Sequence, residues 1–102
     1  MAEFVPVAKA GDLAPGEKMC VIVHGKRVAL FNVDGTVYAI DDMCSHAEAS
    51  LSEGEFRGEV VVCPRHGARF NVKTGAALSL PAWAPVATYP VKVEDGEIKV
   101  AL

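Results

Sequence analysis

Two short segments of the chain combine a cysteine with a histidine, side chains that commonly bind iron and zinc in proteins. The first segment contains Cys44 and His46, separated by one residue, and the second contains Cys63 and His66, separated by two. Sixteen residues lie between the two segments. Each segment follows a stretch with strand character, so two loops at one end of a sheet can bring all four side chains to one metal site. We predict that these four residues are metal ligands.

Two thiolates and two imidazoles suit either a tetrahedral zinc ion or an iron–sulfur cluster with mixed ligands. Zinc-finger spacing usually groups Cys with Cys and His with His, whereas each segment here carries one of each. A cluster with two irons fits this arrangement better, because each loop can give its cysteine to one iron and its histidine to the other. A structural zinc site is the alternative that the spacing leaves open.

The elements that must position these loops are short runs rich in β-branched and aromatic residues. The predicted strands cover residues 21–23, 28–31, 36–40, 59–62, 69–72, 87–93 and 97–100. Asp34-Gly35 and Asp95-Gly96 predict two-residue hairpin turns, and a further turn is expected at Gly25-Lys26. Pro90 predicts an edge strand or the start of a new strand. Helical structure is expected only as one or two turns within residues 47–53.

These features predict an all-β fold of antiparallel strands, either a partial barrel or a sandwich. The chain has 102 residues, of which 51% are hydrophobic, and this is enough to bury the core of one domain. The sequence contains no repeat or linker, so we expect a single domain over residues 1–102.

Composition excludes several classes of partner. The formal net charge is −3, which argues against nucleic acid and anionic membranes, since both select basic surfaces. No apolar run approaches the roughly 20 residues needed to cross a bilayer, and the first residues lack the features of a signal peptide. The three cysteines are an odd number, which argues against a disulfide scaffold. We therefore expect a cytoplasmic protein.

The segments Cys44-Ser45-His46 and Cys63-Pro64-Arg65-His66-Gly67 resemble the two-box signature of the Rieske [2Fe–2S] family. The resemblance continues through most of the chain, including Phe70-Asn71 and Leu80-Pro81-Ala82. It implies a Rieske-like fold of stacked antiparallel sheets, with a small cluster-binding subdomain at about residues 42–82.

The resemblance also implies one Rieske-type [2Fe–2S] cluster and a role for each ligand. Cys44 and Cys63 would bind the buried iron, and His46 and His66 the outer iron near solvent. Gly67 would let the backbone pass close to the cluster, and Pro81 in the proline-containing loop would shield it.

Four positions depart from the pattern of the respiratory Rieske proteins. Ala49 and Arg65 replace the cysteines of a disulfide, and Ala68 and Phe70 replace a serine and a tyrosine whose hydroxyls bond the sulfurs. Losing those donors lowers the potential, so we expect a value at the low end of the Rieske range of about −150 to +300 mV.

The pattern resembles the soluble ferredoxins of aromatic-ring dioxygenase systems. This implies an electron carrier rather than an enzyme, moving single electrons from a flavin-containing reductase to a terminal oxygenase. A monomer is the expected state for a carrier of this size. Docking of both partners is expected near His46 and His66. The alternative is a small Rieske subunit of a larger reductase such as nitrite reductase.

Other residues have competing interpretations. Five acids near the first box form either a docking face for a cationic partner or ordinary solvated loop charges: Asp41, Asp42, Glu48, Glu53 and Glu55. Cys20 precedes an apolar run and is predicted to be a core residue. His24 is predicted to lie on the surface of a hairpin. Trp83 either covers the proline-containing loop or a partner surface, or simply packs in the fold.

Overall fold

The computed structural model describes residues 3–43, 49–65, 67–79 and 84–101. These ranges contain ten β-strands, two 3-10 turns and no α-helix. The strands are β1 (Phe4–Lys9), β2 (Lys18–Val23), β3 (Lys26–Val33), β4 (Thr36–Asp41), β5 (Phe56–Arg57), β6 (Val60–Val62), β7 (Arg69–Asn71), β8 (Thr88–Tyr89), β9 (Val91–Glu94) and β10 (Glu97–Ala101), and the 3-10 turns are η1 (Ala10–Asp12) and η2 (Leu51–Glu53). No helix of the described part is long and apolar enough to cross a bilayer.

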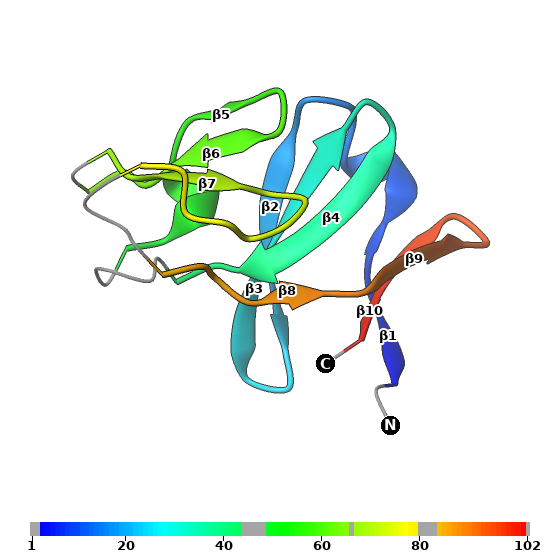
Figure 1. Cartoon of the computed structure of the whole chain (residues 1–102). Helices are drawn as coiled ribbons and strands as arrows, with labels where there is room; N and C mark the ends of the chain where they lie inside the picture. The colour runs from blue at the N-terminus through cyan, green and yellow to red at the C-terminus, as the bar shows by residue number, and fades with distance from the viewer. Residues whose placement is uncertain (1–2, 44–48, 66, 80–83, 102) are drawn as a thin grey trace.

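The described strands form three antiparallel sheets (Figure 1), as the all-β prediction requires. Their strand orders are β1-β10-β9, β2-β3-β4-β8 and β5-β6-β7. Figure 1 shows the β5–β7 sheet at one end of the molecule and the β9–β10 hairpin at the other. The four-stranded sheet lies between them and packs against both.

Strand β3 separates two hydrophobic cores. Its residues 28–33 are all buried, and alternate side chains of a strand point to opposite faces. Ala29 and Phe31 accordingly belong to a first core shared with β6 and β7, whereas Val28 and Leu30 belong to a second core shared with β10. The first core, which lies under the two predicted ligand loops, contains Ala29, Phe31, Val33, Ile40, Leu51, Val61, Cys63, Ala68, Phe70, Val72 and Val86.

Two of the three predicted hairpin turns are confirmed, and the third is shifted by one residue. Asp34-Gly35 and Asp95-Gly96 are two-residue turns between paired strands, and all four residues have positive φ, as a type I′ turn requires. The third turn is His24-Gly25 and not Gly25-Lys26, because Lys26 pairs with Val23 in the ladder.

Pro90 divides the predicted strand at 87–93 into two strands of different sheets. β8 pairs with β4, whereas β9 pairs with β10, so the chain crosses between sheets at the proline. The prediction of a new strand at Pro90 is confirmed.

The remaining predicted strands are also found, with ends that differ by at most three residues. The helical turn expected within 47–53 is η2. Strands β1 and β5 were not predicted.

Candidate metal centre

The loop that carries Cys44 and His46 is closed at its base by backbone contacts between the end of β4 and η2. The Leu51 N–H donates to the Asp42 carbonyl at 2.7 Å, and Met43 and Ser50 form an isolated antiparallel bridge. Cys44 and His46 lie outside the described residues. The structure therefore defines both ends of the first ligand loop.

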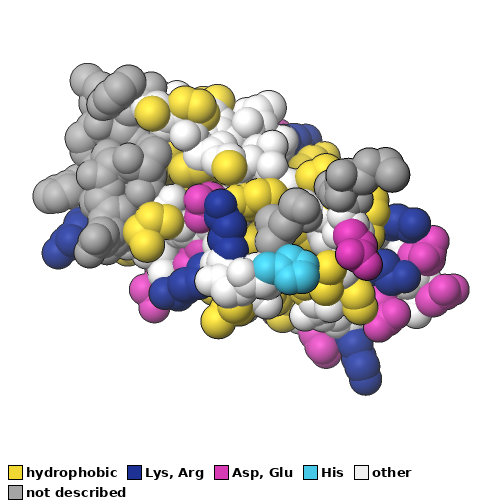
Figure 2. Space-filling view, turned by 90° about the horizontal axis from the view of Figure 1, so that it is seen from below, with side chains coloured by type: hydrophobic (Ala, Val, Ile, Leu, Met, Phe, Trp, Pro, Cys, Tyr) yellow, Lys and Arg dark blue, Asp and Glu magenta, His cyan; other side chains and the backbone are white. Residues whose placement is uncertain are grey.

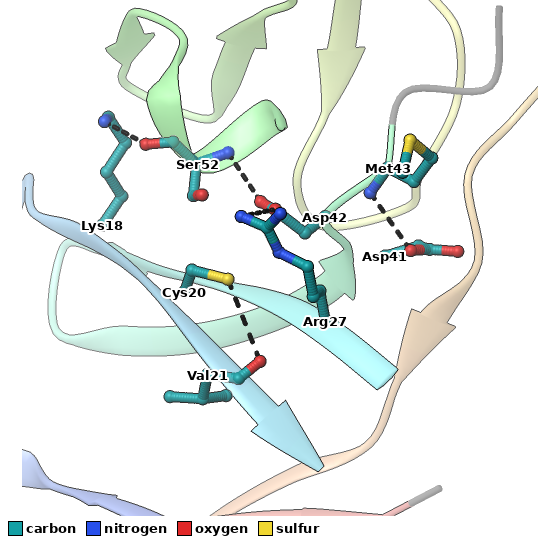
Figure 3. Close-up of polar contacts among 8 residues, drawn as sticks. All are labelled: Lys18, Cys20, Val21, Arg27, Asp41, Asp42, Met43 and Ser52. Atoms are coloured by element: carbon teal, nitrogen blue, oxygen red, sulfur yellow. Dashed lines mark hydrogen bonds and ion pairs between the residues drawn. The ribbon is translucent and has the colours of Figure 1, made fainter. Parts of the chain in front are cut away.

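Asp42, directly before this loop, is a buried carboxylate with its own set of partners (Figure 3). Its side chain is 1% exposed. One oxygen accepts the Ser52 N–H at 2.8 Å, and the other lies 3.3 Å from Arg27 Nη2. Burial raises the pKa of the Asp42 carboxyl, but hydrogen bonds from Ser52 and Ser50 and the Arg27 charge outweigh burial and hold that pKa below its ordinary value. Asp42 is thus an internal carboxylate, and both interpretations offered for it, a docking face and a solvated loop charge, were wrong.

The loop that carries Cys63 and His66 joins β6 to β7. Val62 pairs with Arg69 across its base, and the Cys63 N–H donates to the Ala68 carbonyl at 2.7 Å. Gly67 has a φ of 72°, in the left-handed region where glycine is strongly favoured. His66 lies outside the described residues. The turn therefore gives Gly67 a backbone role independent of any bound group.

Cys63 is the one predicted ligand within the described residues. It is a free thiol, 1% exposed, in the first core. A buried thiol beneath a tight turn has the low exposure expected of a ligand on the inner side of a metal centre.

The bases of the two ligand loops meet in the first core. Leu51, which follows the first loop, is fully buried in the same cluster as Cys63. The Val62 N–H, just before Cys63, donates to the Glu55 carbonyl at 2.8 Å. Beneath them Phe56 packs edge-on against Phe31 of the central sheet, with ring centroids 4.9 Å apart. These contacts bring the described bases of the two loops to the same end of the molecule.

A third segment runs beside the second loop. The Leu78 N–H donates to the Arg69 carbonyl at 2.7 Å, and the Arg69 N–H donates to Ser79 Oγ at 3.1 Å. The residues that follow, including Pro81 and Trp83, lie outside the described residues.

Cys20 and His24 belong to strand β2 and the turn after it. Cys20 is exposed, so its prediction as a core residue was wrong. It lies on the same face of β2 as Ile22, which is 70% exposed. His24 is exposed in its turn, as predicted.

The described residues next to the two ligand loops in sequence carry charges of both signs. Of the predicted acidic group, Glu53 and Glu55 are exposed, Asp41 is half-buried and accepts the Met43 N–H at 3.1 Å, and Glu48 lies outside the described residues. Arg65 and Arg69, beside the second box, are exposed. Figure 2 shows acidic and basic side chains interspersed over one face of the described part. The charge pattern near the loops is mixed.

The described residues fit a metal centre at this end of the fold. They supply a buried thiol, a tight glycine turn and two loop bases in contact. They contain no group of three potential metal ligands, and only one of the four predicted ligands is among them. With two thiolates and two imidazoles as the donor set, the chemistry suits a mixed-ligand two-iron cluster.

Comparison with known proteins identifies the family. The model of the Rieske [2Fe-2S] domain matches residues 3–90. The ferredoxin subunit of 3-phenylpropionate/cinnamic acid dioxygenase from Escherichia coli K12 is 55% identical over 76 residues, which cover 74% of this chain and 72% of the relative. The ferredoxin component of the naphthalene 1,2-dioxygenase system from Pseudomonas putida is 37% identical over 100 residues, covering 98% and 96%.

Solved structures agree with the sequence comparison. A chain in the complex of reduced oxygenase and oxidized ferredoxin of carbazole 1,9a-dioxygenase superimposes with a TM-score of 0.91 at 40% identity, covering 96% of this chain and 92% of that one. The small subunit of a putative nitrite reductase gives a TM-score of 0.80 at 31% identity, covering 96% and 97%.

The matches decide between the two cofactors that the spacing left open. A Rieske domain holds one [2Fe–2S] cluster rather than zinc, and the named relatives are ferredoxins, which carry electrons and do not catalyse a reaction themselves. The ferredoxin component of the naphthalene dioxygenase system and the chain from the carbazole dioxygenase complex both match this chain along nearly its whole length. The chain therefore belongs to the Rieske [2Fe–2S] domain family.

Proposed function

We propose that this chain carries single electrons from a flavin-containing reductase to the terminal oxygenase of an aromatic-ring dioxygenase system. The observation that carries the proposal is the match to dioxygenase ferredoxins over 98% of this chain and 96% of the relative. The match thus extends over nearly the whole length of a ferredoxin component. The named complex of ferredoxin and oxygenase in carbazole 1,9a-dioxygenase supports the same pairing here.

Cys44, His46, Cys63 and His66 are the proposed ligands. Cys63, at 1% exposure, suits the buried iron together with Cys44, and His46 and His66 would hold the outer iron. When bound, the cluster supplies reversible one-electron chemistry. The four side chains would supply every protein ligand that such a cluster needs, which would leave no position free for a substrate. This supports electron transfer and not catalysis at the iron.

The residues beside the second ligand loop limit the access of water to the Cys63 thiol. Ala68 and Phe70, both fully buried, present apolar surface on the protein side of the second loop, which keeps water away from the Cys63 thiol. We propose that both partners dock near His46 and His66. Glu53 and Glu55 are the exposed acids available to steer a cationic partner.

We further propose that residues 1–102 are one Rieske domain with a cluster-binding part at about residues 42–82. The separate β5-β6-β7 sheet within that range supports this division. A cytoplasmic, monomeric carrier that binds neither nucleic acid nor membrane fits the net charge of −3.

Electron paramagnetic resonance of the dithionite-reduced protein tests the function. The expected spectrum has the low average g value of a cluster with mixed Cys and His ligands. A rapid-mixing experiment with an oxidised oxygenase component should then show reoxidation of the chain, slowed when Glu53 and Glu55 are replaced by lysine. A four-cysteine spectrum, or a protein that holds zinc and no iron, would contradict the proposal.

The alternative is a small subunit of nitrite reductase. A structural neighbour of that description supports it, with a lower TM-score than the ferredoxin. Reoxidation by the oxygenase separates the two functions, because a reductase subunit should act only in complex with its own large subunit.

A midpoint potential near the low end of the Rieske range is part of the proposal. Adding a hydroxyl should raise it, because donors to sulfur stabilise the more negative, reduced form. We expect Ala68→Ser and Phe70→Tyr each to raise the midpoint by ~40 mV, which corresponds to ~1 kcal/mol of preferential stabilisation for one electron. Protein-film voltammetry measures the shift. Phe4→Tyr, at a 39% exposed position in β1, is the matched control and should leave the midpoint unchanged.

A further inference from the structure

Asp42 links the strand that enters the first ligand loop to the turn that leaves it. Asp42 follows β4 directly, and η2 begins nine residues later at Leu51. The Asp42 carbonyl accepts the Leu51 N–H at 2.7 Å, and its Oδ1 accepts the Ser52 N–H at 2.8 Å. One residue therefore receives two successive N–H groups of the turn and closes the loop of residues 43–50.

The carboxylate is itself held from the central sheet. Arg27 of β3 places Nη2 3.3 Å from Asp42 Oδ2, and the Arg27 carbonyl accepts the Asp42 N–H at 3.2 Å. Lys18 of β2 donates its Nζ to the Ser52 carbonyl (Figure 3), so the turn is also tied to the sheet from its other side. The loop base thus rests on two strands of the central sheet through polar contacts.

Burial of the Asp42 side chain makes its contacts with the protein important for stability. The Asp42 side chain is 1% exposed whereas the Arg27 side chain is 53% exposed, so the carboxylate depends on its protein partners in place of water. A carboxyl group at such a depth costs free energy unless hydrogen bonds or an opposite charge compensate it. Loss of the carboxylate would therefore leave the Ser52 N–H without its acceptor at the base of the first ligand loop.

We propose that Asp42 is a positioning residue: by closing the base of the 43–50 loop against η2 and Arg27, it holds Cys44 and His46 in the geometry that retains the cluster. The inference rests on the proposed ligand set. It differs from a docking role, because Asp42 has no surface to offer a partner.

The test compares Asp42→Ala with Asp42→Asn in the cluster-loaded protein. Asparagine keeps an oxygen for the Ser52 N–H, whereas alanine removes it. Asp42→Ala is expected to release iron to a chelator roughly tenfold faster, the factor that corresponds to one hydrogen bond to an ionised group, and to shift or broaden the g values of the reduced cluster. Asp42→Asn is expected to restore g values close to those of the unsubstituted protein.

Asn32→Ala is the matched control for a loss of general stability. Asn32 is also buried, and its side chain makes two 2.8 Å hydrogen bonds, to the Leu13 carbonyl and from the Gly35 N–H, away from the ligand loops. This variant is expected to lower the free energy of unfolding while keeping the g values and the iron-release rate. Equal effects of Asn32→Ala and Asp42→Ala on both cluster readouts would overturn the proposal.

Two further outcomes are decisive. If Asp42→Ala does not fold, Asp42→Ser takes its place, because its shorter side chain withdraws the acceptor from Ser52; unchanged g values and iron release in that variant would overturn the proposal. If the unsubstituted protein lacks the mixed-ligand signal, the ligand set itself fails. If the unsubstituted protein shows the mixed-ligand signal and Asp42→Ala keeps the same g values and iron-release rate, only the positioning role of Asp42 is contradicted.

Discussion

Replacing Cys63 by alanine is expected to abolish cluster binding, whereas replacing Cys20 by alanine is expected to leave it intact. Cys63 is buried at the base of the second loop, and Cys20 is exposed on β2. An iron held by two cysteines is not retained when one of them is replaced by alanine. The water that could take the empty position is a poor substitute for a thiolate on iron. Iron and acid-labile sulfide per chain, with the visible absorption spectrum, measure the result.

The same pair of variants separates cluster loss from misfolding. Cys63→Ala removes only a sulfur from the first core and should cost ~1 kcal/mol through packing, so far-ultraviolet circular dichroism should still show the β-sheet signal. Its unfolding midpoint should fall further than packing alone explains, because cluster binding contributes to folding stability. A Cys63→Ala protein with full iron content, or a colourless Cys20→Ala protein, would contradict the ligand assignment.

The sequence predicted most of the strand framework because the signals for it are local. Asp-Gly turns need positive φ at two successive residues, and β-branched runs on either side define the paired strands. Pro90 marked the change of sheet between β8 and β9 for an equally local reason, since it lacks the N–H that a continuous ladder would use. Features of this kind can be recognised without knowing what packs against them.

Strands β1 and β5 were not predicted, for two different reasons. β1 contains Pro6 and has a register shift next to it, and it becomes a strand by pairing with β10 at the other end of the chain. β5 has only two residues and pairs with β6. Neither segment has enough strand character of its own to be recognised.

Cys20 shows the limit of hydrophobicity as a guide to burial. The apolar run of β2 suggested a buried strand, but β2 is an edge strand of the four-stranded sheet, and only one of its faces contacts the second core. Met19, Val21 and Val23 lie on the covered face, and Cys20 and Ile22 on the other. Lys18, two residues before Cys20, is the one signal in the sequence that marks the open face.

Asp42 was missed for a different reason. Acidic residues near a functional loop are usually solvated, and the sequence offers five of them together. What distinguishes Asp42 is the place it takes between Ser52 and Arg27, which depends on the tertiary pairing of β3 with β4. Asp42 lies one residue after a strand and two before Cys44, and this position is the only local sign in the sequence that its side chain bonds to backbone groups of the loop.

Replacing Gly54 by alanine is expected to destabilise the fold and disturb both ligand loops together. Gly54 follows η2, and a Cβ at this position would lie 1.8 Å from the Val62 carbonyl oxygen. Its φ of −83° is open to any residue, so space and not conformation requires the glycine. Val62 directly precedes Cys63, and η2 directly follows the first loop. The added methyl group must therefore push the two loop bases apart.

The obstacle is backbone on both sides, so side-chain rotation cannot relieve it. Leu51 O would also lie 3.3 Å from the new Cβ, and the Leu51 and Val62 N–H groups are both engaged in hydrogen bonds. Overpacking of this kind costs about 1–3 kcal/mol and sometimes more, and we expect Gly54→Ala at the upper end, ~3 kcal/mol, in urea unfolding. The cluster spectrum should change as well, because metal sites tolerate displacements of only about 0.5 Å.

Gly11→Ala provides the comparison that isolates this contact. Gly11 also lies outside the positive-φ region, and a Cβ there would meet no atom within 4 Å. We expect that variant to keep the stability and spectrum of the unsubstituted protein, or to gain slightly from the lower entropy of its unfolded state. If Gly54→Ala behaved like Gly11→Ala, the two loop bases would be free to separate without cost. The close backbone approach between η2 and β6 would then have no part in holding the ligands, and the spacing of the two boxes would have to depend on the cluster alone.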